Sequence, residues 1–176
     1  MFTHQVTFAK KLLTPLSLSI SLLLGTLTIS WISYFDFSAF NQDINDWNTS
    51  SLLDSALMFA DATSFNQHLD RWDMSRVTHM NGMFSFATSF SGNISSWNVS
   101  SVMDASLMFL GATAFNQDLC PWQDSFAYDS MVDDIFTSSG CSFQDTPQFD
   151  EQGPFCGSEC VSFLFHLFSV YISFLL

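Results

Sequence analysis

The sequence predicts an α/β repeat solenoid built from 25-residue coils, each with one short strand and one short helix. Tryptophans and Met-Phe pairs carry this prediction, because both recur with the same 25-residue period. A fixed period between 20 and 50 residues is typical of stacked repeats, whose units bury their apolar faces only against neighbouring units. About four repeats are expected over residues 33–136. The aromatic residues expected in the repeat core are Trp47, Trp72, Trp97, Trp122, Phe59, Phe84 and Phe109.

The strand and the helix are predicted from two different spacings within one repeat. Leu69, Trp72 and Met74 follow the spacing that turns alternate side chains inward from a short strand. The next apolar residues fall at helical intervals on a stripe about 120° wide, which predicts a short helix with one buried face. Those residues are Val77, Met80, Met83, Phe84 and Ala87. Ser75 and its counterparts in the two neighbouring repeats, Ser50 and Ser100, stand where the N-cap of that helix is expected.

An asparagine ladder is expected between the coils. Asn41, Asn66 and Asn116 occupy equivalent positions, so stacking brings their side-chain amides beside the turn backbone of neighbouring coils. The third repeat carries Ser91 and Gly92 instead of Asn-Gln. A gap in the ladder is therefore expected at that repeat.

Residues 1–32 are predicted to be a secretory signal peptide or an N-terminal membrane anchor. Lys10 and Lys11 precede an uncharged stretch over residues 12–35, the layout of a charged region followed by an apolar one. The best small-residue cleavage site lies at residues 28–30. An uncleaved stretch of 24 uncharged residues is long enough to span a bilayer, but Pro15 and Gly25 interrupt it, so cleavage is favoured. Both outcomes place the repeats outside the cell, because the lysines stay cytoplasmic.

A hydrophobic tail is predicted at the other end, over residues 161–176. Its 16 uncharged positions are few for a membrane-spanning helix, which needs about 20. A membrane-buried tail, a removable signal for a GPI anchor and an error of gene prediction are the three interpretations. The GPI signal lacks its usual polar spacer of about 8–12 residues. The chain is expected to meet a membrane only through the leader or this tail.

The cysteines lie in the last third of the chain, in or near a predicted C-terminal cap at residues 137–160. They are Cys120, Cys141, Cys156 and Cys160. Behind a secretory leader such a cluster indicates disulfides, and three pairings are possible. Proximity in sequence favours Cys120 with Cys141 and Cys156 with Cys160. Zinc is the alternative, although the spacing matches no paired Cys-x-x-Cys pattern.

The charge of the chain argues against nucleic acid as a partner. The net charge is −13, from 17 acidic and 4 basic residues. Removal of the leader leaves those acids against Arg71 and Arg76, a net charge of −15. Phosphate backbones and anionic lipid headgroups would be repelled by such a surface. The acids are mostly single aspartates in turns, which is typical of a solvated face.

No catalytic residue set and no cofactor site is predicted. The chain has no G-x-S-x-G elbow, no glycine-rich phosphate loop and no H-E-x-x-H motif. Asp43, His68, Asn93 and Asp118 share one position of the repeat, where a weak calcium site is conceivable. Oxygen-rich turns alone do not make a calcium loop, so no metal site is predicted.

Three glycosylation sequons begin at Asn48, Asn93 and Asn98. In a secreted eukaryotic protein these asparagines are candidate glycan acceptors. Asn48 and Asn98 share their position with Asp73, where a polar residue of a turn or strand is the simpler interpretation. Asn93 is the preferred acceptor, because it lies in a Ser-Gly-Asn turn.

Residues 65–84 resemble the 25-residue repeat of BspA-like surface proteins, with a sequence that opens FNQ and continues to WDMSRVTHMNGMF. The same repeat occurs in mycoplasma surface lipoproteins and in secreted proteins of diatoms and other microbes. The resemblance covers roughly residues 33–136, and residues 139–160 look like the cysteine-bearing end of the diatom proteins. It implies a leucine-rich-repeat-like solenoid, and adhesion is the activity of some bacterial members. A lipoprotein anchor is not implied, because no cysteine follows the leader.

These observations together predict a non-enzymatic extracellular or cell-surface protein, either secreted or membrane-anchored. Its partner is expected to be a protein or a glycan bound on the exposed strand face, and no cofactor is expected. The alternative is a structural, wall-associated protein whose acidic stack serves as a coat.

Overall fold

The computed structural model describes residues 38–126, 131–147, 155–158 and 160. The predicted leader and hydrophobic tail lie outside the described residues. All described residues belong to one compact unit, 36–176. In this part of the chain, no helix is both long and apolar enough to cross a membrane.

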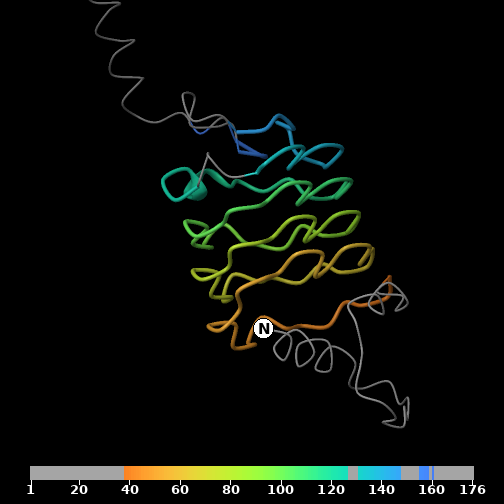
Figure 1. Cartoon of the computed structure of the whole chain (residues 1–176). Coiled ribbons are helices and arrows are strands. Elements are labelled where there is room, and N and C mark those ends of the chain that lie inside the picture. The colour runs from red at the N-terminus through yellow and green to blue at the C-terminus, as the bar shows by residue number, and fades with distance from the viewer. Residues whose placement is uncertain (1–37, 127–130, 148–154, 159, 161–176) are drawn as a thin grey trace, which may run out of the picture. The chain divides into compact units, whose positions relative to one another are not determined.

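Successive coils of the chain stack in sequence order (Figure 1). We number them from the recurring phenylalanine: coil 1 is 40–64, coil 2 is 65–89, coil 3 is 90–114 and coil 4 is 115–141. Rings at equivalent positions form two columns along the stack. In one column, Phe40, Phe65, Phe90 and Phe115 have centroids 5.5–5.7 Å apart. In the other, Phe59, Phe84, Phe109 and Phe136 have centroids 5.4–5.7 Å apart.

The predicted α/β fold, with a leucine-rich-repeat-like strand and helix in every coil, is wrong. Among the described residues there is no α-helix, and the only helical element is the 3₁₀ helix η2 (Cys120–Trp122). Strand pairing is limited to isolated bridges. Three parallel bridges join Asp54 to His79, His79 to Asp104 and Asp104 to Met131. Otherwise the described coils consist of turns and of residues without regular secondary structure.

Where a helix was predicted, the chain forms consecutive turns. Such turns fit the same spacing of apolar residues as a helix does. The Met83 amide donates to the Met80 carbonyl, and the Ala87 amide donates to the Phe84 carbonyl. Each of these bonds spans three residues, whereas an α-helix closes over four. Gly82 has φ of 60° and Phe86 has φ of 56°, values that a right-handed helix excludes. Apolar residues three apart therefore point inward from a run of turns as well as from a helix.

The serines predicted as helix N-caps belong to turns closed by a side chain. The Ser75 amide and hydroxyl both donate to Oδ1 of Asp73, at 3.0 and 2.6 Å. Asn48 accepts in the same way from Ser50. A short acidic or amide side chain that binds the backbone two residues on makes an Asx turn. The serines are therefore polar residues of a turn and do not begin a helix.

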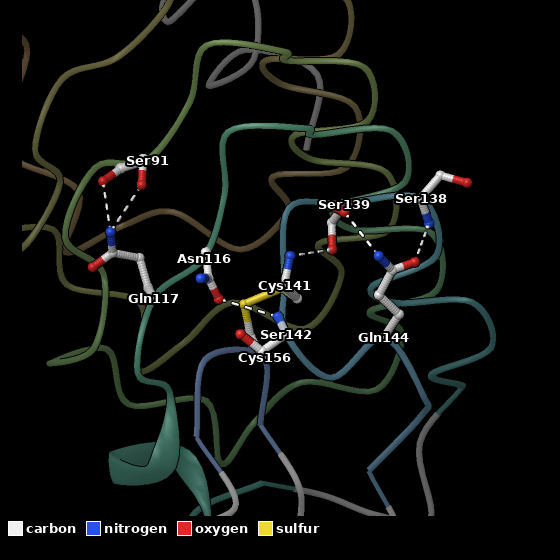
Figure 2. The surroundings of a disulfide bond; sticks show 9 residues. All are labelled: Ser91, Asn116, Gln117, Ser138, Ser139, Cys141, Ser142, Gln144 and Cys156. Atoms are coloured by element: carbon white, nitrogen blue, oxygen red, sulfur yellow. Dashed lines mark hydrogen bonds between the residues drawn. A yellow bond between two sulfur atoms is a disulfide. The ribbon is translucent and has the colours of Figure 1, made fainter.

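One side of the stack is held by side chains, and we call its four segments, 41–49, 66–74, 91–99 and 116–122, the side-chain ladder. The Asn66 amide donates to Oδ1 of Asn41, and the Ser91 amide donates to Oδ1 of Asn66, both at 2.9 Å. These bonds confirm the asparagine ladder. At the expected gap, Nε2 of Gln117 donates to the carbonyl and hydroxyl of Ser91, both at 2.9 Å (Figure 2).

Tryptophans form a second row of bonds on the side-chain ladder. The indole Nε1 of Trp72 donates to the Ile44 carbonyl at 3.0 Å, and that of Trp97 donates to the Leu69 carbonyl at 2.8 Å. The indole Nε1 of Trp122, in η2, donates in the same way to the Ile94 carbonyl of the preceding coil. Each indole therefore fills the core and satisfies a buried carbonyl, which explains why tryptophan recurs.

Two disulfides close the C-terminal end, but the favoured pairing was wrong. Cys120 pairs with Cys160, and Cys141 pairs with Cys156 (Figure 2). The chain folds back so that Cys156 forms an antiparallel bridge with Asp118. This return places the last two cysteines against different earlier segments. Proximity in sequence was misleading because residues 155–158 lie beside coil 4, where Cys156 bridges Asp118.

Candidate functional site

Another set of segments in the stack is joined mainly by hydrogen bonds between backbone groups of neighbouring coils. We call its segments, 54–61, 79–86, 104–111 and 131–138, the turn ladder. In coil 2 the amides of Met80, Gly82, Phe84 and Phe86 donate to carbonyls of the next coil, at 2.7–2.9 Å. Between them, the amides of Met83 and Ser85 close turns within the coil. Alternate amides thus link the coils, and these backbone bonds between coils require no particular side chain.

Residues with positive φ recur along the turn ladder at two positions of each coil. The first position holds Leu57, Gly82, Leu107 and Asp134, and the second holds Asp61, Phe86, Gly111 and Ser138. Their φ values lie between 55° and 67°. This conformation favours glycine, and a bulky residue there is a strained exception of the kind that clusters at functional sites.

Two of the bulky residues lie over a glycine in the next coil. A Cβ built on Gly82 would stand 2.7 Å from Cδ2 of Leu57, and one built on Gly111 would stand 2.6 Å from Cδ1 of Phe86. Nevertheless Leu57 is 60% exposed and Phe86 is 49% exposed. The glycines therefore make room for apolar side chains that remain largely in solvent.

All the large apolar side chains exposed in the described part of the chain lie on the turn ladder or one residue before its segments. They are Leu53, Leu57, Phe86, Met103, Leu107 and Met131. We call them the apolar stripe. Single exposed apolar residues are normal on proteins, so the confinement of these six to one ladder is what distinguishes them.

The charge beside the apolar stripe is entirely acidic. The turn-ladder segments carry five aspartates and no lysine or arginine. The aspartates are Asp54, Asp61, Asp104, Asp133 and Asp134. Two of them also shape turns, since Oδ1 of Asp54 accepts from the Ala56 amide and Oδ1 of Asp104 accepts from the Ser106 amide. The site thus combines apolar side chains with a negative potential.

The residues expected in the repeat core have these positions in the structure. Six of the seven are buried, with at most 3% of their surface exposed: Trp72, Trp97, Trp122, Phe59, Phe84 and Phe109. Trp47, in the first coil, is half-buried.

The sequon asparagines all accept hydrogen bonds from the serine two residues on. Asn48 and Asn98 are exposed, whereas Asn93 is half-buried and its backbone amide donates to Nδ1 of His68 at 3.1 Å. The preferred acceptor of the sequence analysis is therefore the least accessible of the three.

The position conceived as a calcium site is used for hydrogen bonding within and between coils. Oδ1 of Asp43 accepts from the Asn45 amide, and Oδ1 of Asp118 accepts from the Cys120 amide. Nowhere in the described ranges do three His, Cys, Asp or Glu side chains gather as metal ligands would. With all four cysteines in disulfides, no thiolate remains for zinc.

One aspartate of the side-chain ladder has a perturbed acidity. The hydrogen bond from the Ser75 hydroxyl is the main reason that the pKa of Asp73 lies below its usual value, and the Ser75 amide adds to it. Asn48 and Asn98 hold the equivalent turn without a charge. Asp73 and these asparagines are therefore turn residues, and they belong to the side-chain ladder, whereas the apolar stripe follows the turn ladder.

The sequence analysis missed the apolar stripe because its residues lie outside the predicted helical face. A signal was present in the equivalent positions, where Leu57, Gly82 and Leu107 alternate glycine with leucine. A glycine in a position otherwise filled by a large residue indicates positive φ. A right-handed helix excludes positive φ, so such a residue favours turns at this point of the coil.

A family model described as "Mycoplasma protein of unknown function, DUF285" matches residues 30–149. No curated protein and no solved structure matches the chain significantly.

Proposed function

The chain belongs to the DUF285 family, and we propose that it is a BspA-like, non-enzymatic binding protein of the cell surface or extracellular space. The apolar stripe is its binding surface. The observation that carries the proposal is the confinement of large exposed apolar side chains to one side of the described stack. The absence of any catalytic motif in the sequence supports a binding role.

An extracellular location is supported by the two disulfides at the C-terminal end. Disulfides persist in oxidising compartments and are rare in the cytosol. Cys120–Cys160 and Cys141–Cys156 join the last described residues to coil 4. The leader predicted at residues 1–32 agrees with export.

A protein partner is favoured over a glycan by the chemistry of the apolar stripe. Five of its six residues are leucine or methionine, and Phe86 is its one aromatic ring. Methionine is over-used at protein-binding surfaces, because its flexible thioether adapts to different shapes. None of these six side chains carries a polar group that could hydrogen-bond to a sugar ring and orient it.

The charge of the surface selects among protein partners. Five aspartates flank the apolar stripe without a compensating lysine or arginine in the turn-ladder segments. Complementary potentials accelerate association and suppress wrong partners. We therefore propose that the partner presents apolar side chains flanked by lysine or arginine.

A coat protein is the second candidate, supported by the net charge of −13. Such a role requires an acidic, solvated surface but no apolar binding side. It predicts accumulation in the wall without a saturable partner.

Peptide titration with the secreted, disulfide-bonded protein tests the proposal. A Leu/Lys peptide should bind, and matched Leu/Glu and Ser/Lys peptides should bind at least ten times more weakly. Replacement of Leu107 and Phe86 by glycine should abolish binding of the first peptide. Gln42→Ala, an exposed change on the side-chain ladder, is the control and should leave it unchanged.

Two outcomes would contradict a protein-binding turn ladder. Equal binding by the double glycine variant would exclude the apolar stripe as the site. Binding on a glycan array with no peptide binding would support the glycan alternative. Imaging with a tag between Cys160 and Val161 tests the location separately, and a cytosolic signal would refute it.

A further inference from the structure

Two sequons occupy the same position of the repeat, at residues 48–50 in coil 1 and 98–100 in coil 3. In both, the asparagine and the serine are exposed. The middle residue, Thr49 or Val99, is buried with at most 2% of its surface exposed. The core therefore takes up the middle residue, and the two residues that define each sequon lie in solvent.

We infer that Asn48 and Asn98 are modified with N-linked glycans and that Asn93 is not. This inference goes beyond the binding role of the apolar stripe, and it rests on the extracellular location proposed above. The transfer forms a bond between Nδ2 of asparagine and C1 of a sugar, as Nδ2 loses a proton. The bond between C1 and the pyrophosphate of a lipid-linked oligosaccharide breaks, and the lipid pyrophosphate leaves. The folded stack accommodates such a bulky group only where Nδ2 reaches solvent.

The turns at these positions use only the oxygen of each asparagine amide. Oδ1 of Asn48 accepts from the amide and the hydroxyl of Ser50, at 3.1 and 2.7 Å. Oδ1 of Asn98 accepts from the Ser100 amide at 3.0 Å. No described residue accepts a hydrogen bond from Nδ2 of either asparagine. A glycan on Nδ2 leaves Oδ1 in place, so each turn can persist after modification.

Asn93, in contrast, is held against coil 2 through its backbone. Its amide donates to Nδ1 of His68 at 3.1 Å, and its carbonyl accepts from the Leu69 amide at 3.3 Å. A Cβ built on the preceding residue, Gly92, would stand 2.1 Å from the carbonyl oxygen of Gln67. A glycan on this half-buried side chain would have to displace the neighbouring coil. The folded protein should therefore carry none there.

Coil 2 supplies a natural comparison, because the exposed Asp73 holds the equivalent position. Oδ1 of Asp73 accepts from the amide and the hydroxyl of Ser75, at 3.0 and 2.6 Å. A carboxylate and an amide thus make the same kind of turn. Exchange of aspartate and asparagine at this position should keep the turn while it removes or creates a sequon, since Met74 and Ser75 complete an Asn-x-Ser sequence.

The two glycans would belong to the side-chain ladder. No sequon lies within the turn-ladder segments. Glycans are bulky and solubilising, so their position decides which surface remains open to a partner. Modification of Asn48 and Asn98 leaves the turn-ladder residues themselves unmodified.

Peptide mass spectrometry of the secreted protein, expressed from the full chain in a eukaryotic host, tests the inference. Peptide N-glycosidase converts each glycosylated asparagine into aspartate, which identifies the modified positions. Residues 48 and 98 should be converted, and residue 93 should not. Asn48→Asp and Asn98→Asp, which copy Asp73, should each remove one glycan and leave secretion unchanged.

Two further variants test whether position in the repeat determines modification. Asp73→Asn should add a third glycan, because it creates a sequon at the same exposed position of coil 2. Ser95→Ala removes the sequon of Asn93 but keeps the asparagine, and it should leave the number of glycans unchanged.

Three results would overturn the inference. Secreted protein with no glycosidase-sensitive mass would refute the glycans and leave the extracellular location intact. Conversion of residue 93 in place of residues 48 and 98 would refute the assignment of positions. Protein retained in the cytosol would refute the glycans together with the proposed location. None of these readouts involves partner binding, so the apolar stripe is tested separately.

Discussion

The turn ladder and the side-chain ladder join the same coils by different chemistry. On the turn ladder, backbone amides such as those of Gly82 and Phe84 bond directly to backbone carbonyls of the next coil. On the side-chain ladder, the bonds between coils come from the Trp97 indole and the Asn66 side chain. The first arrangement is indifferent to residue type, whereas the second requires particular side chains.

This difference explains where the repeat is regular and where it varies. Tryptophan and asparagine recur because each supplies a donor or acceptor that another residue type would not place correctly. The positive-φ positions of the turn ladder hold leucine, glycine, aspartate, phenylalanine or serine. Because the bonds between coils need no particular side chain here, these positions can carry a binding surface.

The largest expected effect is a loss of stability when a tryptophan of the side-chain ladder is replaced. Trp97→Ala should destabilise the protein by about 3–5 kcal/mol, because it leaves a cavity beside Trp122 and an unpaired Leu69 carbonyl. Leu107→Gly on the turn ladder is the matched change and should cost less than about 1 kcal/mol, since glycine relieves a positive φ. Urea unfolding of both variants measures the contrast. Similar losses would contradict the division between the two ladders.

The disulfides extend the comparison to the C-terminal end. There the cap continues the side-chain ladder, because the Ser142 amide donates to Oδ1 of Asn116. Replacing Cys120 and Cys160 by serine opens a loop of 40 residues and should cost about 4 kcal/mol. Opening the 15-residue loop of Cys141–Cys156 should cost about 3 kcal/mol. Chemical unfolding gives these values, and peptide mapping checks the pairing. Peptides linking Cys120 to Cys141 would refute it.

A smaller effect is expected at the asparagine row. Asn66→Ala removes the acceptor of the Ser91 amide and should destabilise by about 1–2 kcal/mol. Asn66→Asp retains an acceptor at the same place and should lose less. Amide hydrogen exchange at Ser91 provides a local readout. Unchanged protection in the alanine variant would show that this bond does not hold the coils.

The smallest expected effect concerns the titration of Asp73 in its turn. Its pKa is lowered mainly by the Ser75 hydroxyl, so Ser75→Ala should move the pKa back toward the ordinary aspartate value. A lowered folded pKa means that the stabilisation is present above the unfolded pKa and is lost as pH falls through the folded one. Carboxyl NMR titration measures the shift. Asp73→Asn, which copies Asn48 and Asn98, is the control and should keep the turn.

The asparagine ladder was predictable from the sequence because its geometry depends on side chains that the period places in line. The same reasoning identified Ser91 as the gap, where Gln117 bridges instead. The run of turns was not predictable in this way. Apolar residues three apart suit both a helix and consecutive turns, and only the positive φ values distinguish them.

By itself, the sequence determined the period, the residues that recur with it and the acidic character of the chain, because these are properties of residue order and type. Only the tertiary structure decided the disulfide pairing, since the return of residues 155–158 beside Asp118 depends on how distant segments pack. The tertiary structure also decided which side carries the apolar stripe. That side depends on how the backbone runs through each turn, and residue order alone did not show that Leu57, with its positive φ, is 60% exposed.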